Sequence, residues 1–230
     1  MANAGTLPTR LASSGLATTY IAATRIPYGA AVVRAAAGTC KAAITPDVAI
    51  LGIAMDDDRE HLYDGFYEIY EPVPVVNSGD VRTLCCFISN ADMVAGDYLE
   101  VGDFSSHGTT QNWGVLAEAG SAAGETPVVT AVAQALEDGD FGSAYYQVPA
   151  SDVAVGDTTI TMAAGAIASM GLVVGEFILM ADINGAVHVN RITGLTSTVI
   201  SLEIPSVGAL VNGDNDLVYR LWQKKVKLIG

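Results

Sequence analysis

The apolar residues of this chain fall in short runs that are separated by clusters of turn residues. Runs of this length and spacing are typical of strands in a β-sandwich or β-barrel. In the first part of the chain they lie at 20–22, 31–33, 50–55, 66–76, 81–88, 98–101, 113–119 and 128–136. The pattern predicts an all-β protein.

A repeated Gly-Asp pair marks many of the turns. It occurs as Gly79-Asp80, Gly96-Asp97, Gly102-Asp103, Gly139-Asp140, Gly156-Asp157 and Gly213-Asp214, with Gly175-Glu176 as a near copy. Glycine adopts positive φ without steric cost, and we expect the Asp side chain to bond the backbone two residues on. Each pair is therefore predicted to end one strand and to direct the next.

Two of the apolar runs resemble each other. Residues 50–57 and 130–138 alternate apolar with small residues and end in acidic ones. This alternation suits the tapering interior of a small barrel. The second run also has the composition of a short helix, so strand and helix both stay open there.

The composition changes near residue 144. No aromatic residue lies between Tyr146 and Phe177, and 163–171 is rich in alanine and glycine. We expect strands after this point at 158–162, 177–181, 187–192, 199–204 and 217–222, with one helical turn at 166–170. Asn184-Gly185 predicts a hairpin turn. The predicted division is an arm at 1–19, a β-barrel module at 20–143 that folds without the rest, and a second β module at 144–230.

Length and charge narrow the classes of function. With 230 residues the chain buries about 70% of its unfolded surface, so it needs no disulfide or metal to fold. Its three cysteines, Cys40, Cys85 and Cys86, are interpreted as buried free thiols of a protein that folds in a reducing compartment. The formal net charge of −14 argues against nucleic acid as a partner. We also expect no membrane partner, because no apolar stretch approaches the roughly 20 residues of a membrane helix.

The two ends of the chain leave alternatives open. Residues 1–19 lack the pattern of a signal peptide or anchor and form either an extended arm that lies on a neighbour or a disordered tail. Lys224, Lys225 and Lys227 alternate with apolar residues. They either protect the exposed edge of a C-terminal strand or contact an acidic partner surface.

Short apolar motifs lie at 30–33, 42–44, 50–54, 73–75, 95–99, 115–119 and 131–136. They include an apolar-Gly-Ile-Ala strand before a polar loop and an Ala-Gly-Asp-apolar turn. Over about 120 residues these motifs resemble the small β-barrel decoration (cement) proteins of tailed-virus capsids. Residues 155–194 are similar to a β module of phage structural proteins and differ from it by the insert at 163–172.

The resemblance implies a virion structural protein that binds the outside of an assembled shell. Its partner would be the major capsid protein, and it would act as a homotrimer at local threefold positions. The protein would be made in the host cytoplasm and carried on the capsid exterior.

Candidate catalytic and metal-ligating residues are sparse in the sequence. His61, His107 and His188 lie in unrelated contexts, and Ser106 and His107 are adjacent, which rarely lets two side chains face each other. Phosphate-loop, dinucleotide-binding and zinc-helix motifs do not occur. We therefore expect no enzymatic activity and no cofactor.

An acidic run, Asp56, Asp57 and Asp58 with Glu60 and Asp64, is the best metal candidate, because hard cations prefer several carboxylate oxygens. Its spacing lacks the order of a calcium loop. A solvated loop and a divalent-ion or lattice contact both stay open.

Aromatic residues supply the candidate interface. Such side chains pack in cores, cover protein interfaces or stack on sugars, and the sequence leaves these three roles open. The candidates, with two apolar residues of the arm, are Leu7, Pro8, Tyr63, Phe66, Tyr67, Tyr70, Tyr145 and Tyr146.

The sequence favours a structural protein that stabilises a capsid by bridging capsomers. Two alternatives remain, a host-attachment or carbohydrate-binding module and a tail or head-completion component. Position on the particle separates all three.

Overall fold

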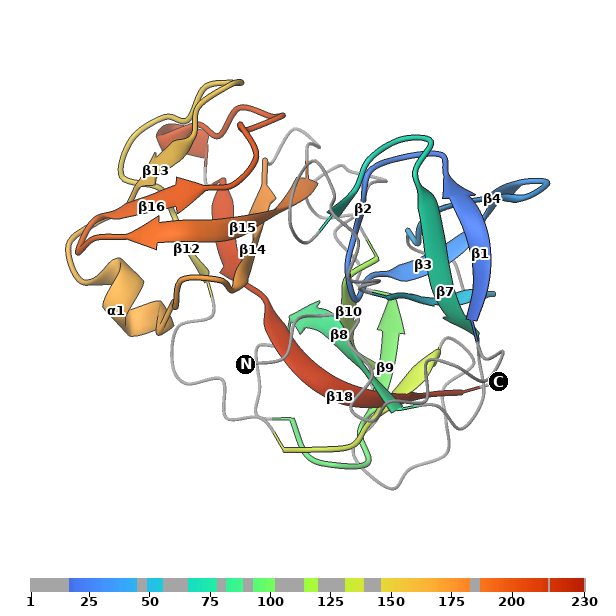
Figure 1. Ribbon diagram of the computed structural model, residues 1–230. Coiled ribbons are helices and arrows are strands. Elements are labelled where there is room, and N and C mark those ends of the chain that lie inside the picture. Colours follow the sequence, from blue (N-terminus) through green and yellow to red (C-terminus); the bar gives the residue numbers. More distant parts are fainter. Residues whose placement is uncertain are drawn as a thin grey trace. The chain divides into compact units, whose positions relative to one another are not determined.

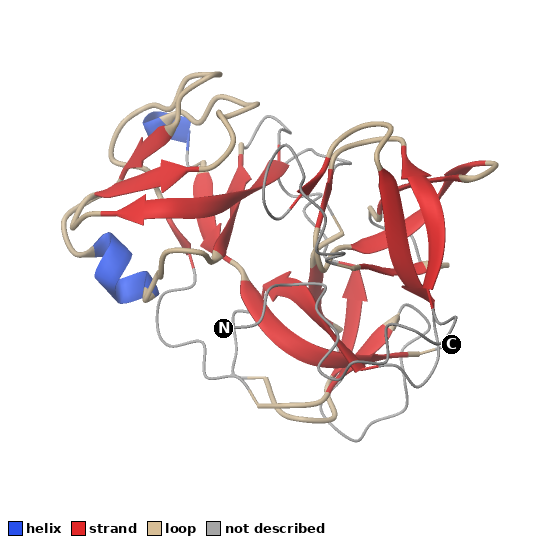
Figure 2. Ribbon diagram, viewed as in Figure 1, coloured by secondary structure: helices blue, strands red, loops and turns tan. Residues whose placement is uncertain are grey.

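The computed structural model describes residues 17–44, 49–55, 66–77, 82–88, 93–101, 114–119, 131–138, 146–182, 187–214 and 216–229. At residues 77, 82–88, 118, 187–188 and 222–224 only the backbone is described. Strands dominate the described chain (Figure 2) and confirm the predicted all-β class.

The chain forms two compact units. Unit 1 contains residues 1–103, 112–140 and 223–230, and unit 2 contains 104–111 and 141–222. The predicted second module, 144–230, thus ends too late, because its last strand belongs to unit 1. The predicted arm, 1–19, also ends too late, since residues 17–19 already pair with another strand. Residues 1–16 lie outside the described part of the chain.

The first five-stranded barrel of unit 1 closes in the order β1-β4-β3-β5-β7. Its strands are β1 (Ala17–Ala22), β3 (Ala31–Ala36), β4 (Thr39–Ala42), β5 (Gly52–Ala54) and β7 (Pro72–Asn77). β1 and β4 run parallel, and the other neighbours are antiparallel. A two-stranded sheet of β2 (Ile26–Pro27) and β6 (Phe66–Tyr67) accompanies it. Alanine, valine and tyrosine side chains fill its core, among them Val32, Val73 and Tyr67.

The second barrel of unit 1 closes in the order β10-β8-β18-β11-β9. Its strands are β8 (Arg82–Ile88), β9 (Tyr98–Val101), β10 (Leu116–Glu118), β11 (Ala133–Ala135) and β18 (Trp222–Leu228). In Figure 1 the red β18 lies among the green strands of this barrel. Of the run at 130–138, the described residues 131–138 contain a strand and no helix.

The C-terminal strand corrects the hypothesis about the lysine cluster. β18 lies between β8 and β11 in the closed barrel, so it offers no exposed edge for lysines to protect. Lys225 instead pairs with Glu137, with 3.5 Å between Nζ and Oε2.

The two barrels are the same fold twice. We number the five strands of each barrel by their order in the sequence. Around each barrel the neighbours are then first, third, second, fourth and fifth, and the first and third strands run parallel. The three residues of β5 pair with the last three of β7, and the three residues of β11 pair in the same way with the last three of β18.

Hydrogen bonds beyond the strands repeat as well. Met55 N–H donates to Pro74 C=O (2.9 Å) in the first barrel, and Leu136 N–H donates to Lys225 C=O (3.0 Å) in the second. The similar runs 50–57 and 130–138 thus contain the fourth strands of two equivalent barrels, β5 and β11.

The main segment of unit 2, residues 141–221, is inserted between the fourth and fifth strands of the second barrel. Its sheet has the order β12-β17-β14-β15-β16-β13. The strands are β12 (Tyr146–Gln147), β13 (Thr159–Thr161), β14 (Phe177–Ala181), β15 (Val187–Leu195), β16 (Val199–Leu202) and β17 (Leu217–Arg220). β14 and β15 pair as the predicted hairpin strands, and their turn lies outside the described residues.

Two short helices accompany this sheet. The predicted helical turn is α1 (Ala166–Met170), which Gly165 and Gly171 bound in the left-handed conformation. Ile167 and Met170 of α1 pack into the core of unit 2. Residues Asn212–Asp214 form the 3₁₀ turn η2.

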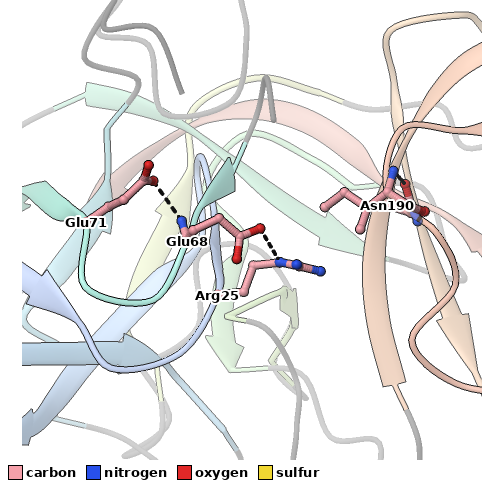
Figure 3. A network of polar contacts seen from close by, with 5 residues as sticks. Arg25, Glu68, Glu71 and Asn190 are labelled. Carbon is pink, nitrogen blue, oxygen red and sulfur yellow. Dashed lines mark hydrogen bonds and ion pairs between the residues drawn. The ribbon is translucent and has the colours of Figure 1, made fainter. Parts of the chain in front are cut away.

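A buried amide links two segments of unit 2. Asn190 of β15 is fully buried, donates from Nδ2 to Ile204 C=O (2.7 Å) and accepts from Ile204 N–H at Oδ1 (3.2 Å). Figure 3 shows this side chain with its bonds. The amide continues the backbone pairing where β16 has ended.

Candidate functional site: a family of clamped turns

Five four-residue turns share one pattern of backbone hydrogen bonds, and we call them clamped turns. The fourth residue's N–H donates to the first residue's C=O. A single residue on another segment holds the turn through two further bonds. Its C=O accepts the N–H of the third turn residue, and its N–H donates to the C=O of the fourth. The turns are 27–30, 68–71, 94–97, 154–157 and 173–176, and they are clamped on Ala54, Ala22, Ala135, Ser206 and Ile192, respectively.

An acidic side chain caps four of these turns. The carboxylate of the fourth residue accepts the N–H of the first residue, three positions back. The donor and acceptor pairs are Glu68 and Glu71 (2.7 Å), Val94 and Asp97 (2.7 Å), Ala154 and Asp157 (2.8 Å), and Val173 and Glu176 (3.1 Å). The fifth turn begins with Pro27, which has no N–H, and ends in Ala30.

This geometry corrects the predicted role of the Gly-Asp pairs. The acid bonds the backbone three residues back, not two residues on. Gly96-Asp97, Gly156-Asp157 and Gly175-Glu176 end clamped turns, whereas Gly213-Asp214 lies in η2. The other three pairs lie outside the described residues.

The third residue of every clamped turn has positive φ. Four turns place glycine there: Gly29 (77°), Gly96 (111°), Gly156 (94°) and Gly175 (93°). The turn at 68–71 places Tyr70 there, with φ of 75°. A residue with a side chain costs about 1–2 kcal/mol in the left-handed conformation. The Tyr70 side chain is 83% exposed, so burial within the chain does not offset this cost.

The turn that carries Tyr70 is held from several sides. Tyr70 N–H donates to Ala22 C=O (2.8 Å), and Ala22 N–H donates to Glu71 C=O (2.9 Å). Arg25 Nε pairs with Glu68 Oε1 at 2.7 Å. Figure 3 shows these contacts in sequence, from Glu71 to Glu68 and from Glu68 to Arg25. The turn is therefore a rigid support for its two central side chains.

Those central side chains are apolar. Beside Tyr70, Ile69 is 50% exposed. In unit 2 the second residues of two clamped turns, Val155 and Val174, are 67% and 54% exposed. The fold thus presents apolar side chains to solvent on stiff supports, an arrangement that suits protein contacts.

An ion-pair network braces the turn of Val174. Arg220 Nη2 lies 3.0 Å from Glu176 Oε1, so the acid that caps the turn is also paired. Arg191 Nε donates to Gly175 C=O (3.3 Å) and Nη1 lies 3.8 Å from Glu203 Oε2. The turn of Tyr70 is braced at a different position, because Arg25 pairs there with Glu68, the first residue of the turn.

Two of the predicted interface residues are core residues. Phe66 and Tyr67 form β6 and are fully buried, because this strand pairs with β2. The Tyr67 hydroxyl donates to Met55 C=O, and its ring lies 4.9 Å from that of Tyr28. Their assignment to an interface is wrong.

The remaining interface candidates differ in whether the structure describes them and in how far they are exposed. Tyr146 is partly exposed, and its ring lies 5.6 Å from that of Tyr219. Leu7, Pro8, Tyr63 and Tyr145 lie outside the described residues. Tyr70 is the predicted candidate that the structure places in solvent on a rigid turn.

The structure describes few of the candidate metal and catalytic residues. Asp56, Asp57, Asp58, Glu60, Asp64, His61 and His107 lie outside the described residues, and His188 lies in β15 with only its backbone described. Among the residues that the structure describes, no three His, Cys, Asp or Glu side chains gather to hold a metal ion. Burial raises the pKa of the Cys40 thiol to about 11.

Sequence reasoning named Tyr70 as an interface candidate but missed the clamped turn that carries it. The turn reads Glu-Ile-Tyr-Glu and lacks the glycine that marks its relatives. A carboxylate at the fourth position was the available signal.

The described residues contain no helix long and apolar enough to cross a membrane. The sequence matches no protein-family model and no curated protein.

Proposed function

We propose that this protein is a structural component of a tailed-virus particle that binds the outer surface of the assembled capsid and bridges neighbouring capsomers. The observation that carries the proposal is the repeated barrel of unit 1. A chain with one fold twice offers two surfaces of the same design. Such a chain suits a shell, in which one protein surface recurs many times.

The proposed mechanism is mechanical. The exposed apolar side chains of the clamped turn 68–71 are held in place before binding, so docking through them costs little conformational entropy. A standard interface buries about 800 Å² per partner, and a homotrimer repeats it without any chemistry. The proposal therefore includes no enzymatic activity and no cofactor.

The proposed partner is the major capsid protein, and the proposed location is the capsid exterior. The net charge of −14 supports a protein partner over nucleic acid. Residues 1–16 are proposed as an arm that adds a strand to a neighbour's sheet. Because β1 begins at Ala17, an arm deletion must stop at residue 16 to keep the pairing of β1 with β7.

Cosedimentation with shells of the same virus's major capsid protein tests this function. We expect the chain to sediment with assembled shells at low and at high salt, because apolar contacts are not screened as exposed charges are. Deletion of residues 2–16 should weaken binding and leave the melting temperature unchanged.

Two results contradict the proposal. A chain that stays in the supernatant at every salt concentration does not bind shells. A chain that binds host glycans or purified tails, and ignores shells, has the role of an attachment module or of a tail component.

A further inference from the structure

We propose that Tyr70, with Ile69, is an anchor that inserts into an apolar pocket on the partner protein. The partner is the capsid surface, so this inference rests on the proposed function. The anchor is defined by the clamped turn 68–71, which projects an aromatic and an aliphatic side chain from unit 1.

The choice of residue at position 70 is the first support. Four clamped turns of this chain place glycine at the third position, and only glycine adopts positive φ there without strain. Tyr70 keeps that conformation while its ring stays 83% exposed. Because the described fold gains little from the ring, its use lies outside the chain. Strained residues of this kind concentrate at binding sites.

The satisfied backbone of the turn is the second support. Glu68 N–H is bonded to the Glu71 carboxylate, Tyr70 N–H to Ala22 C=O, and Glu71 C=O to Ala22 N–H. The Glu68 carboxylate is paired with Arg25. A partner therefore covers the turn without leaving these groups unpaired, which removes a main cost of burial.

The chemistry of the tip favours a protein pocket over a sugar. Sugar recognition combines an aromatic face with polar groups that bond the hydroxyls. Here the neighbour of Tyr70 is Ile69, which is aliphatic. The Glu71 carboxylate is engaged by the Glu68 N–H within the turn, and the Glu68 carboxylate is paired with Arg25. Tyrosine is enriched at interface hot spots, where an apolar ring fills a pocket and the hydroxyl finds a partner.

Shell binding of three variants tests the anchor. Tyr70→Ala removes the ring, Tyr70→Phe removes the hydroxyl, and Val155→Ala is the matched control at an exposed clamped turn of unit 2. We expect Tyr70→Ala to weaken binding to assembled shells at least about tenfold. Tyr70→Phe should bind more tightly than Tyr70→Ala, and Val155→Ala should bind as the wild type does.

The melting temperature separates an anchor from a structural residue. An exposed ring contributes little to the fold, so Tyr70→Ala should melt within about 2 °C of the wild type. Tyr70→Gly, which relieves the positive φ, keeps the test open should the alanine variant not fold. It should lose shell binding as Tyr70→Ala does.

Several results overturn the anchor. Wild-type binding by Tyr70→Ala overturns it and leaves the proposed function standing, as does an equal loss in Val155→Ala. A large drop in the melting temperature of both Tyr70→Ala and Tyr70→Gly makes the ring structural. If the wild type and all variants fail to bind shells, the proposed function and the anchor fail together. Binding of the wild type to a glycan array that Tyr70→Ala abolishes assigns the residue to a sugar platform instead.

Discussion

At the scale of single residues, two glycines of the two barrels share a positive φ, but only one of them is also packed closely against the backbone of another strand. Gly38 and Gly114 lie between the second and third strands of their barrels, with φ of 73° and 68°. A Cβ at Gly38 meets nothing within 4 Å, whereas a Cβ at Gly114 lies 2.3 Å from Ala31 C=O. Gly114 also bonds Ala31 and Ala43 through its backbone. It is therefore needed for packing as well as for φ.

The two glycines form a matched pair for mutation. Gly38→Ala should lower the free energy of unfolding by about 1 kcal/mol, from backbone strain alone. Gly114→Ala should lower it by about 3 kcal/mol or more, because the backbone around Ala31 must also shift. Urea unfolding measures both. Equal losses would contradict the close packing at Gly114.

Cys40 links a single thiol to the pH dependence of stability. Burial raises the pKa of its thiol from 9.0 to about 11, so the folded chain keeps this proton to a higher pH than the unfolded chain does. The stability that the neutral thiol contributes is fully present below pH 9 and is lost as the pH rises toward 11. Between pH 8 and 11 the wild type should lose about 2 kcal/mol more than Cys40→Ala. Parallel curves of unfolding free energy against pH would contradict the raised pKa.

At the scale of elements, the sequence predicted local structure well. β14 and α1 have the bounds 177–181 and 166–170 that apolar runs and flanking glycines indicate. The return of β18 to the second barrel was not predictable, because pairing between segments far apart leaves no mark in a local pattern. Burial of Phe66 and Tyr67 beside an exposed Tyr70 was equally hidden, since a cluster of aromatics does not reveal which rings a short strand buries.

The carboxylates that cap the clamped turns should differ in how much they stabilise the fold. Asp97 is almost fully buried and caps Val94 N–H, whereas the cap from Asp157 to Ala154 is exposed. Asp97→Ala should cost about 1–3 kcal/mol of unfolding free energy, because it leaves a partly buried N–H unpaired. Asp157→Ala should cost about 1 kcal/mol or less, since water replaces the cap. Thermal unfolding of both variants checks the order, and a larger loss from Asp157→Ala would contradict it.

At the scale of the whole molecule, unit 2 is an insertion in a duplicated barrel. A chain with residues 141–221 replaced by a short Gly/Ser linker keeps all five strands of both barrels. It should give a β-rich circular dichroism spectrum and a cooperative melt. Residues 1–140 alone lack β18 and should melt without cooperativity or aggregate, which reverses the expectation from the sequence that 20–143 folds without the rest. Equal behaviour of the two fragments would contradict the role of β18 as the fifth strand.

The position of this chain on a virus particle is the most direct test of its function. Cryo-electron microscopy of the intact particle should show its density on the outer surface of the shell, across neighbouring capsomers. The Ile69-Tyr70 turn should be buried against the capsid protein. Density confined to the tail or to the inside of the shell, or shells that carry none, would contradict the proposed function.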